Sequence, residues 1–128
     1  YVASGVEIDG PPVNVIWNEI RGQKLHGIIL QSGYGHQVIG NTVINSGSGG
    51  FPMPGVTVNP GVSGFSILGN RAYDDQPQKT QTWGVRIEPG SSAGFTVAGN
   101  DLRGNLNPAG VSNAATGIGL IYGNITGN

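Results

Sequence analysis

"GVRIEPGSSAGFTVAGNDLRGN" (84–105) has almost the same order of glycine, apolar, polar and aromatic residues as the earlier stretch "GVTVNPGVSGFSILGNRAYDD" (55–75). Each contains a Gly-Val segment, a turn rich in Gly, Ser and Pro, an aromatic residue, a second apolar alternation and a Gly-Asn pair. Apolar residues alternate with period two, and no window of a dozen residues has a helical 3.6-residue period. The repeating unit is therefore expected to be short strands joined by turns.

The glycine-led strand that opens each repeat recurs at intervals of 22, 28, 29 and 33 residues. Its copies are expected at 5–8, 27–30, 55–58, 84–87 and 117–120. A repeat of this length with two or three strands fits a coil that climbs one rung per repeat, with equivalent strands stacked in parallel about 4.8 Å apart. We therefore expect Val56 to lie over Ile28, and Val85 over Val56.

Each rung must bury its inward side chains against those of the next rung. The first inward column is expected to consist of Val6, Ile8, Ile28, Leu30, Val56, Val58, Val85, Ile87, Ile118 and Leu120. The second is expected to consist of Val15, Val38, Phe65 and Phe95, with Trp17, Gly40, Leu68 and Ala98 nearby.

An asparagine ends the second alternation in four repeats, at Asn18, Asn41, Asn70 and Asn100. The interpretation we favour is structural: Asn tolerates the left-handed conformation at a bend, and stacked side-chain amides hydrogen-bond along a column. The alternative is a row of amides that bind sugar.

Composition limits the classes of function. Only 10% of the 128 residues are charged and the net charge is −1, so no basic surface for nucleic acid is expected, while 37% hydrophobic residues can supply one core across 1–128. There is no cysteine, which excludes disulfides and thiol chemistry. No apolar run approaches the roughly 18 residues of a membrane span, so membrane insertion is not expected. The opening "YVASGVEIDG" has no Met or signal-peptide pattern, and we expect a piece of a longer chain.

The segments "GVRI", "FTVAGNDLRGN" and "DDQPQKTQTWGVRI" resemble the right-handed parallel β-helix repeats of the pectate-lyase-like superfamily. The branch they resemble most is that of phage tailspikes and bacterial surface-polysaccharide proteins. The resemblance implies an all-β parallel β-helix of about five rungs, located outside the cell or on a virion. It also implies a polysaccharide partner, and either a homotrimer or continuation into further rungs.

Glycoside hydrolysis needs two carboxyl groups at a defined separation, which makes the acidic residues the catalytic candidates. These are Asp74, Asp75, Glu88 and Asp101. Adjacent side chains of an extended segment point to opposite sides, so Asp74 and Asp75 are not automatically a pair. The interpretation we favour for the segment "DDQPQKTQ" is a solvated turn that contains proline, and the two aspartates alone are a thin set of calcium ligands. No metal and no cofactor are expected.

Exposed aromatic rings pack on the apolar faces of sugars, and charged groups beside them bind hydroxyls. The candidates for substrate binding are Trp83, Tyr73, Lys79, Arg86 and Tyr34. Trp83 is equally interpreted as a cap on the core. Arg71 and Asp101 are expected to form a surface ion pair between rungs, Arg86 and Arg103 to lack a clear carboxylate partner, and His36 to be an exposed turn residue.

Three functions remain open at this point. The first is a tailspike-like segment that binds, and in one version depolymerises, a bacterial surface polysaccharide. The second is a structural stalk or adhesin segment without its own activity. The third is a self-contained polysaccharide lyase, glycoside hydrolase or epimerase, which the few acidic and basic residues favour least.

Overall fold

The computed structural model describes residues 4–90 and 94–128, and its regular structure there consists of three-residue strands without a helix. The strands are β1 (Val6–Ile8), β2 (Asn14–Ile16), β3 (Glu19–Arg21), β4 (Ile28–Leu30), β5 (Gln37–Ile39), β6 (Thr42–Ile44), β7 (Val56–Val58), β8 (Ser66–Leu68), β9 (Arg71–Tyr73), β10 (Val85–Ile87), β11 (Thr96–Ala98), β12 (Val111–Asn113) and β13 (Leu120–Tyr122).

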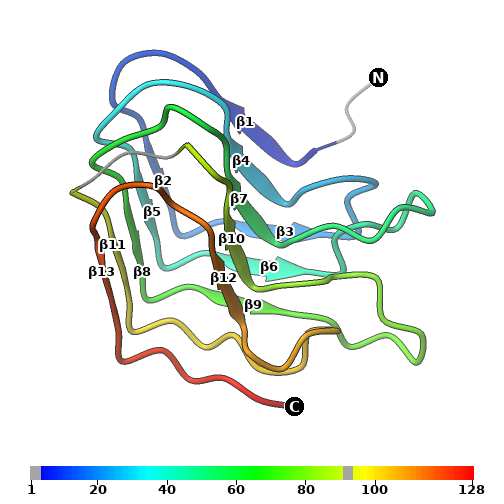
Figure 1. Cartoon of the computed structure of the whole chain (residues 1–128). Helices are drawn as coiled ribbons and strands as arrows, with labels where there is room; N and C mark the ends of the chain where they lie inside the picture. The colour runs from blue at the N-terminus through cyan, green and yellow to red at the C-terminus, as the bar shows by residue number, and fades with distance from the viewer. Residues whose placement is uncertain (1–3, 91–93) are drawn as a thin grey trace.

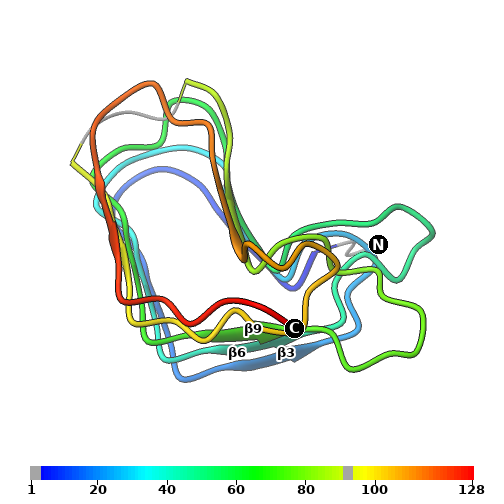
Figure 2. The same cartoon turned by 60° about the horizontal axis from the view of Figure 1, so that its bottom comes forward.

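All pairings between these strands are parallel, and they build three sheets that run the length of a β-solenoid of about four turns. Sheet A has the order β1-β4-β7-β10-β12, sheet B has β2-β5-β8-β11-β13, and sheet C has β3-β6-β9. Single bridges from Arg71 to Asp101 and from Asp101 to Ile125 extend sheet C along the stack. The first strand, β1, and the C-terminus lie at opposite ends of the stack (Figure 1). Successive rungs largely overlap when the molecule is turned so that its bottom comes forward (Figure 2). The expected parallel β-helix architecture is confirmed.

The register of sheet A is the one that the sequence repeat predicts. Val56 pairs with Ile28 on one side and with Val85 on the other. All three side chains are fully buried in the core. Inward apolar residues from successive rungs therefore stack directly on one another, so each rung completes the core of its neighbour.

The predicted position of the fifth glycine-led strand is wrong. The fifth strand of sheet A is β12, whose Val111 pairs with Val85, whereas Leu120 belongs to β13 in sheet B. Ile118 and Leu120, expected to point inward, are 86% and 61% exposed. The sequence "GIGL" imitates the marker, but Gly119 lies where an inward side chain would collide with the Phe95 ring.

The second inward column differs in register from the prediction. Val38 pairs with Ile67, not with Phe65, and Ile67 pairs with Val97. Phe65 and Phe95 precede these strands and form a column of their own, in which the rings stack with centroids 4.9 Å apart. Of the four residues placed near this column, Trp17 is 80% exposed and therefore lies outside the core.

The corner between sheets B and C contains the expected asparagine column. The Nδ2 atoms of Asn18, Asn41 and Asn70 each donate to the Oδ1 atom of the next asparagine along the stack, at 3.0 Å. Asn100 donates in the same way to Asn124, at 2.8 Å. The structural interpretation of the column is confirmed.

The predicted left-handed conformation of the asparagines in this corner is wrong. The positive φ belongs to the residue before the asparagine, which is Gly40, Gly69, Gly99 or Gly123 in four rungs and Trp17 in the first. The asparagine itself is free to place its amide in the corner. There Nδ2 of Asn70 also donates to the backbone oxygen of Val38, at 2.8 Å.

Candidate functional site

Each sheet has an outer face, formed by the side chains that point away from the core. We call these surfaces the sheet A face, the sheet B face and the sheet C face. The sheet C face carries Glu19, Arg21, Thr42, Ile44, Arg71 and Tyr73 from the strands, and Asp101 and Arg103 from the following rung. Ile44 is almost fully buried although it lies outside the main core cluster, so this face is partly covered by its own side chains.

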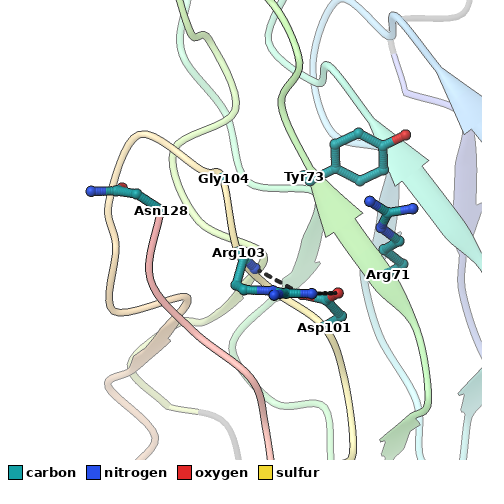
Figure 3. Close-up of a pocket in the computed structure, with 6 residues that line it drawn as sticks. All are labelled: Arg71, Tyr73, Asp101, Arg103, Gly104 and Asn128. Atoms are coloured by element: carbon teal, nitrogen blue, oxygen red, sulfur yellow. Dashed lines mark hydrogen bonds and ion pairs between the residues drawn. The ribbon is translucent and has the colours of Figure 1, made fainter.

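A hollow of about 340 Å³ lies at one end of the sheet C face. It is lined by Arg71, Tyr73, Asp101, Arg103, Gly104 and Asn128 (Figure 3). The guanidinium carbon of Arg71 lies 4.3 Å from the centroid of the Tyr73 ring. The hollow thus combines an aromatic ring, two guanidinium groups, a carboxylate and an amide, which are the groups that bind sugar rings and hydroxyls.

The expected ion pair between Arg71 and Asp101 is replaced by a different one. Asp101 pairs with Arg103 through two short contacts, 2.7 Å from Nη2 to Oδ2 and 2.9 Å from Nε to Oδ1. Arg71 and Asp101 are bridge partners on neighbouring rungs, but the Arg71 side chain packs on Tyr73. The hydrogen bonds from Arg103 hold the pKa of Asp101 below its usual value, so this carboxyl is ionised at neutral pH.

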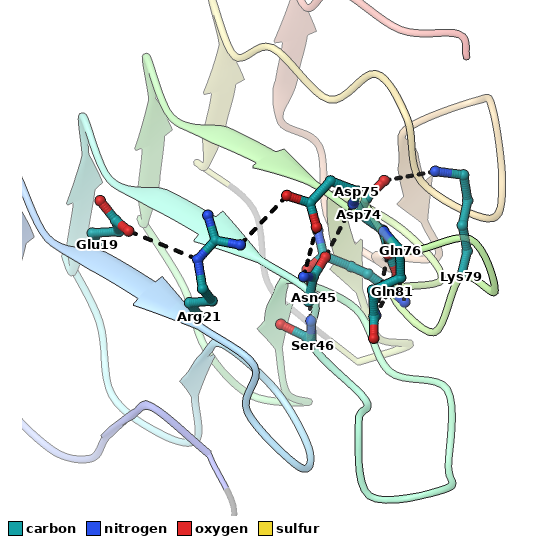
Figure 4. Close-up of polar contacts among 9 residues, drawn as sticks. All are labelled: Glu19, Arg21, Asn45, Ser46, Asp74, Asp75, Gln76, Lys79 and Gln81. Carbon is teal, nitrogen blue, oxygen red and sulfur yellow. Dashed lines mark hydrogen bonds and ion pairs between the residues drawn. The ribbon is translucent and has the colours of Figure 1, made fainter.

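Asp75 extends the sheet C face toward the first rungs. Its carboxylate accepts a hydrogen bond of 2.8 Å from Asn45 and lies 3.4 Å from Nη1 of Arg21 (Figure 4). Arg21 in turn lies 3.9 Å from Glu19. The hydrogen bond from the Asn45 side chain is the main cause of a lowered pKa at Asp75.

Asp74 points the opposite way from Asp75, as adjacent side chains of an extended segment should. It is buried, and its Oδ2 accepts hydrogen bonds of 2.7 Å from the backbone amides of both Thr80 and Gln81. Lys79 closes the same loop by donating to the backbone oxygen of Asp74, at 2.6 Å (Figure 4). The segment "DDQPQKTQ" is therefore a turn organised around one buried carboxylate, and Asp74 and Asp75 do not face a common site.

The sheet A face holds two further candidates. Arg86 and Glu88 form an ion pair of 2.7 Å on one strand end. The expectation that Arg86 and Arg103 lack carboxylate partners is therefore wrong, since Arg86 pairs with Glu88 and Arg103 with Asp101. In both pairs the partner lies two residues away in sequence, on the same side of an extended segment. Trp83 is half-buried just before the strand, and its backbone oxygen accepts from Gly55.

His26, on the sheet A face, is not among the candidate residues that the sequence predicts. Its Nδ1 lies 2.6 Å from Oγ1 of Thr57, a residue that is buried although its neighbours Val56 and Val58 are the ones that point into the core. Burial is the main cause of a lowered His26 pKa, with Glu7 and Glu88 acting in the opposite direction. The pairing of residues 31 apart follows from rung register, which the sequence around His26 does not reveal.

Two other residues lie away from these faces. Tyr34 is 60% exposed in the connection between β4 and β5, where it bridges to Ser63 of the next rung. His36, expected to be exposed, is fully buried: its Nε2 lies 2.7 Å from the backbone oxygen of Ser32, and its Nδ1 accepts from the Val13 amide. It occupies the position that Phe65 occupies one rung later, which makes it a core residue.

The described residues contain no group of three or more potential metal ligands close enough to hold an ion. Within 4–90 and 94–128 there is also no helix long and apolar enough to cross a membrane.

Of the nine candidate residues, the structure brings Tyr73, Asp75 and Asp101 onto one face, Arg86 and Glu88 onto a second, and Asp74 with Lys79 into one loop. Trp83 and Tyr34 lie outside these groups. Comparison with known proteins adds no further assignment, because no family model, no curated protein and no solved structure matches the chain.

Proposed function

We propose that this chain is a tailspike-like β-helix segment that binds a bacterial cell-surface polysaccharide on the sheet C face, outside the cell or on a virion. The observation that carries the proposal is the hollow of about 340 Å³ that contains Tyr73, Arg71, Asp101 and Arg103. It opens on a face whose polar groups recur from rung to rung, which suits a polymer of repeating units. The sequence resemblance to the pectate-lyase-like superfamily supports the same class of ligand.

Binding is favoured over cleavage by the state of Asp75 and Asp101, the two candidate catalytic carboxyl groups on this face. A glycosidase needs one carboxylic acid that stays protonated until it donates to the leaving group. Asp75 and Asp101 both have lowered pKa values, because Asn45 and Arg103 donate hydrogen bonds to their ionised forms. They are suited to accept hydrogen bonds from sugar hydroxyls.

The stalk remains the second candidate. It is favoured because most of the candidate carboxylates already have partners within the chain. Asp74 accepts hydrogen bonds from backbone amides, Glu88 pairs with Arg86, and Asp101 pairs with Arg103. A stalk requires no ligand on any face.

A glycan array followed by affinity measurement separates these functions. We expect binding to an extended bacterial polysaccharide, and Tyr73→Ala should weaken it by roughly three- to tenfold, since an aromatic contact is worth about 0.5–1.5 kcal/mol. The matched control is Tyr34→Ala, which removes an exposed tyrosine far from the hollow and should leave the affinity unchanged. Absence of binding across a broad array, or equal affinity for both variants, would reject the proposal.

The same polysaccharide is then assayed for new reducing ends and for unsaturated uronate. Binding without either product is the expected result. If turnover is found, Asp74→Asn combined with Asp75→Asn tests whether the "DDQPQKTQ" loop (74–81) takes part, and unchanged turnover would remove that loop from consideration.

A further inference from the structure

The sheet B face carries an apolar column that crosses every strand of the sheet. Its members are the last residues of the five strands: Ile16, Ile39, Leu68, Ala98 and Tyr122. The middle residue of β2, β5, β8 and β11 is buried in the core, so the residues on either side of it point outward. The column therefore runs along the stack for roughly 20 Å, at about 4.8 Å per rung.

The ends of this column are well exposed. Ile16 is 43% exposed and Tyr122 is 61% exposed. Trp17 widens the first end: its ring lies over Gly40 of the next rung, where an added Cβ would come within 2.7 Å of the ring carbons. A continuous apolar strip that ends in two exposed aromatic residues is typical of a surface that is covered by a partner.

The sheet B face also differs from the other two faces in charge. The first residues of its strands form a parallel column of Asn14, Gln37, Ser66, Thr96 and Leu120. None of the outward residues on the five strands is charged, whereas the sheet A and sheet C faces both carry acidic and basic groups. Two copies of an uncharged face approach each other without electrostatic repulsion.

The apolar column is complementary to itself when its order is reversed. A two-fold axis along the strand direction, passing over β8, places the rungs of one copy opposite those of the other in reverse order. Leu68 then opposes Leu68, the larger Ile39 opposes the smaller Ala98, and Ile16 with Trp17 opposes Tyr122. Large side chains thereby meet small ones near the centre, and aromatic rings meet apolar side chains at both ends.

We propose that the sheet B face binds a second copy of this chain, as a two-fold pair of solenoids packed sheet to sheet with reversed rung order. The two sheets lie about 10 Å apart, the usual spacing of face-to-face β-sheets. This pairing leaves the sheet C face of each copy open, so it is independent of polysaccharide binding.

Sedimentation velocity over a range of protein concentrations tests the pairing. We expect a concentration-dependent dimer that Leu68→Lys converts to monomer, because two added charges would face each other at the axis. Leu106→Lys is the matched control: Leu106 is 54% exposed in the segment before β12, away from the sheet B face. Urea unfolding of both variants verifies that the fold persists.

Three outcomes would overturn the proposal: a monomer at every concentration, a trimer, or a Leu68→Lys variant that dimerises like the parent chain. A monomeric chain whose polysaccharide binding is lost in Leu68→Lys but kept in Leu106→Lys would instead assign the face to the glycan.

Engineered cysteines test the rung order, and the absence of natural cysteine makes the result easy to interpret. Facing positions on sheets about 10 Å apart are too distant for a direct disulfide, so a short bis-maleimide reagent is used to join the thiols. Reversed order predicts that the reagent cross-links Gln37→Cys to Thr96→Cys chains when the two are mixed, and cross-links little within either sample alone. Cross-links within each separate sample, without any gain on mixing, would contradict the reversed rung order.

Discussion

The chain changes direction both at the corner between sheets B and C and in the connections from sheet C to sheet A. These two regions are stabilised in different ways. The corner always has two residues between strands, such as Gly69-Asn70 between β8 and β9. The connections have six residues at 22–27 and eleven at both 45–55 and 74–84. A left-handed residue and a laddered asparagine fix the corner in each rung, whereas each connection is held by contacts that do not recur. The corner has the same geometry in every rung because the same asparagine hydrogen bond recurs there. The connections vary in length because each is closed by its own side-chain contacts.

The largest expected effect comes from removing one rung of the asparagine ladder. Asn70→Ala leaves Asn41 without its Oδ1 acceptor and Val38 without its side-chain donor, all in buried positions. At about 1–3 kcal/mol for each buried group left unpaired, the free energy of unfolding should fall by roughly 3 kcal/mol or more. Urea unfolding measures it. Asn18→Ala, at the exposed first rung, is the control and should cost about 1 kcal/mol; equal losses would show that the ladder does not act through burial.

The next effect concerns a connection. Asp74→Ala leaves the backbone amides of Thr80 and Gln81 without their acceptor. We therefore expect a loss of about 2 kcal/mol in unfolding free energy, with faster amide hydrogen exchange confined to the 74–81 loop. Asp75→Ala, next to it and exposed, should leave stability nearly unchanged. Faster exchange that spreads into sheet C would contradict the view that this loop is closed by its own contacts.

A third change isolates backbone conformation at the corner. Gly69 has φ of 62°, and an added Cβ meets nothing within 4 Å. Gly69→Ala should therefore destabilise by about 1–2 kcal/mol through left-handed strain alone. Gly69→Asn should cost clearly less, because asparagine tolerates this region, and thermal unfolding compares the two. If both cost the same, the requirement at this position is for space.

The smallest effect is electrostatic and lies where sheet C continues as single bridges. The pKa of Asp101 is lowered in the folded chain by its hydrogen bonds with Arg103, so at intermediate pH the unfolded chain binds more protons. This contribution to stability is fully present above the usual carboxyl pKa and is lost as the pH falls through the folded value. Asp101→Asn should flatten the acid limb of the stability curve slightly, and carbon-detected NMR titration of the Asp101 carboxyl should show the lowered pKa. A titration at or above the usual value would exclude the Arg103 pair in solution.

The sequence was informative where one residue type repeats in one position. The strands led by Gly27, Gly55 and Gly84, and the column of asparagines, follow from period-two alternation and from spacing alone. The predicted register of Phe65 is wrong by two residues, and period-two alternation cannot detect such a slip because Phe65 and Ile67 are both buried. The segment "GIGL" at 117–120 misleads for another reason: it has the residue pattern of a glycine-led sheet A strand but leads into β13 of sheet B.

The candidate sites were less predictable because they depend on pairs from different rungs or on local turns. The contact between His26 and Thr57 joins a residue of the 22–27 connection to the middle residue of β7, so no repeated sequence spacing predicts it. Rung register predicts that Asp101 pairs with Arg71, but the Arg71 side chain packs on Tyr73 and Arg103 pairs with Asp101 from two residues away. Register identifies neighbours, and local geometry then decides which of them pair.

Interstrand NOEs measured on isotopically labelled protein test most directly whether successive rungs stack in parallel register. The account predicts NOEs from the methyl groups of Val56 to those of both Ile28 and Val85, together with backbone NOEs in the parallel pattern along β4, β7 and β10. Antiparallel backbone NOEs, or a Val56 that contacts neither partner, would contradict the stacked solenoid and remove the faces on which both proposals rest.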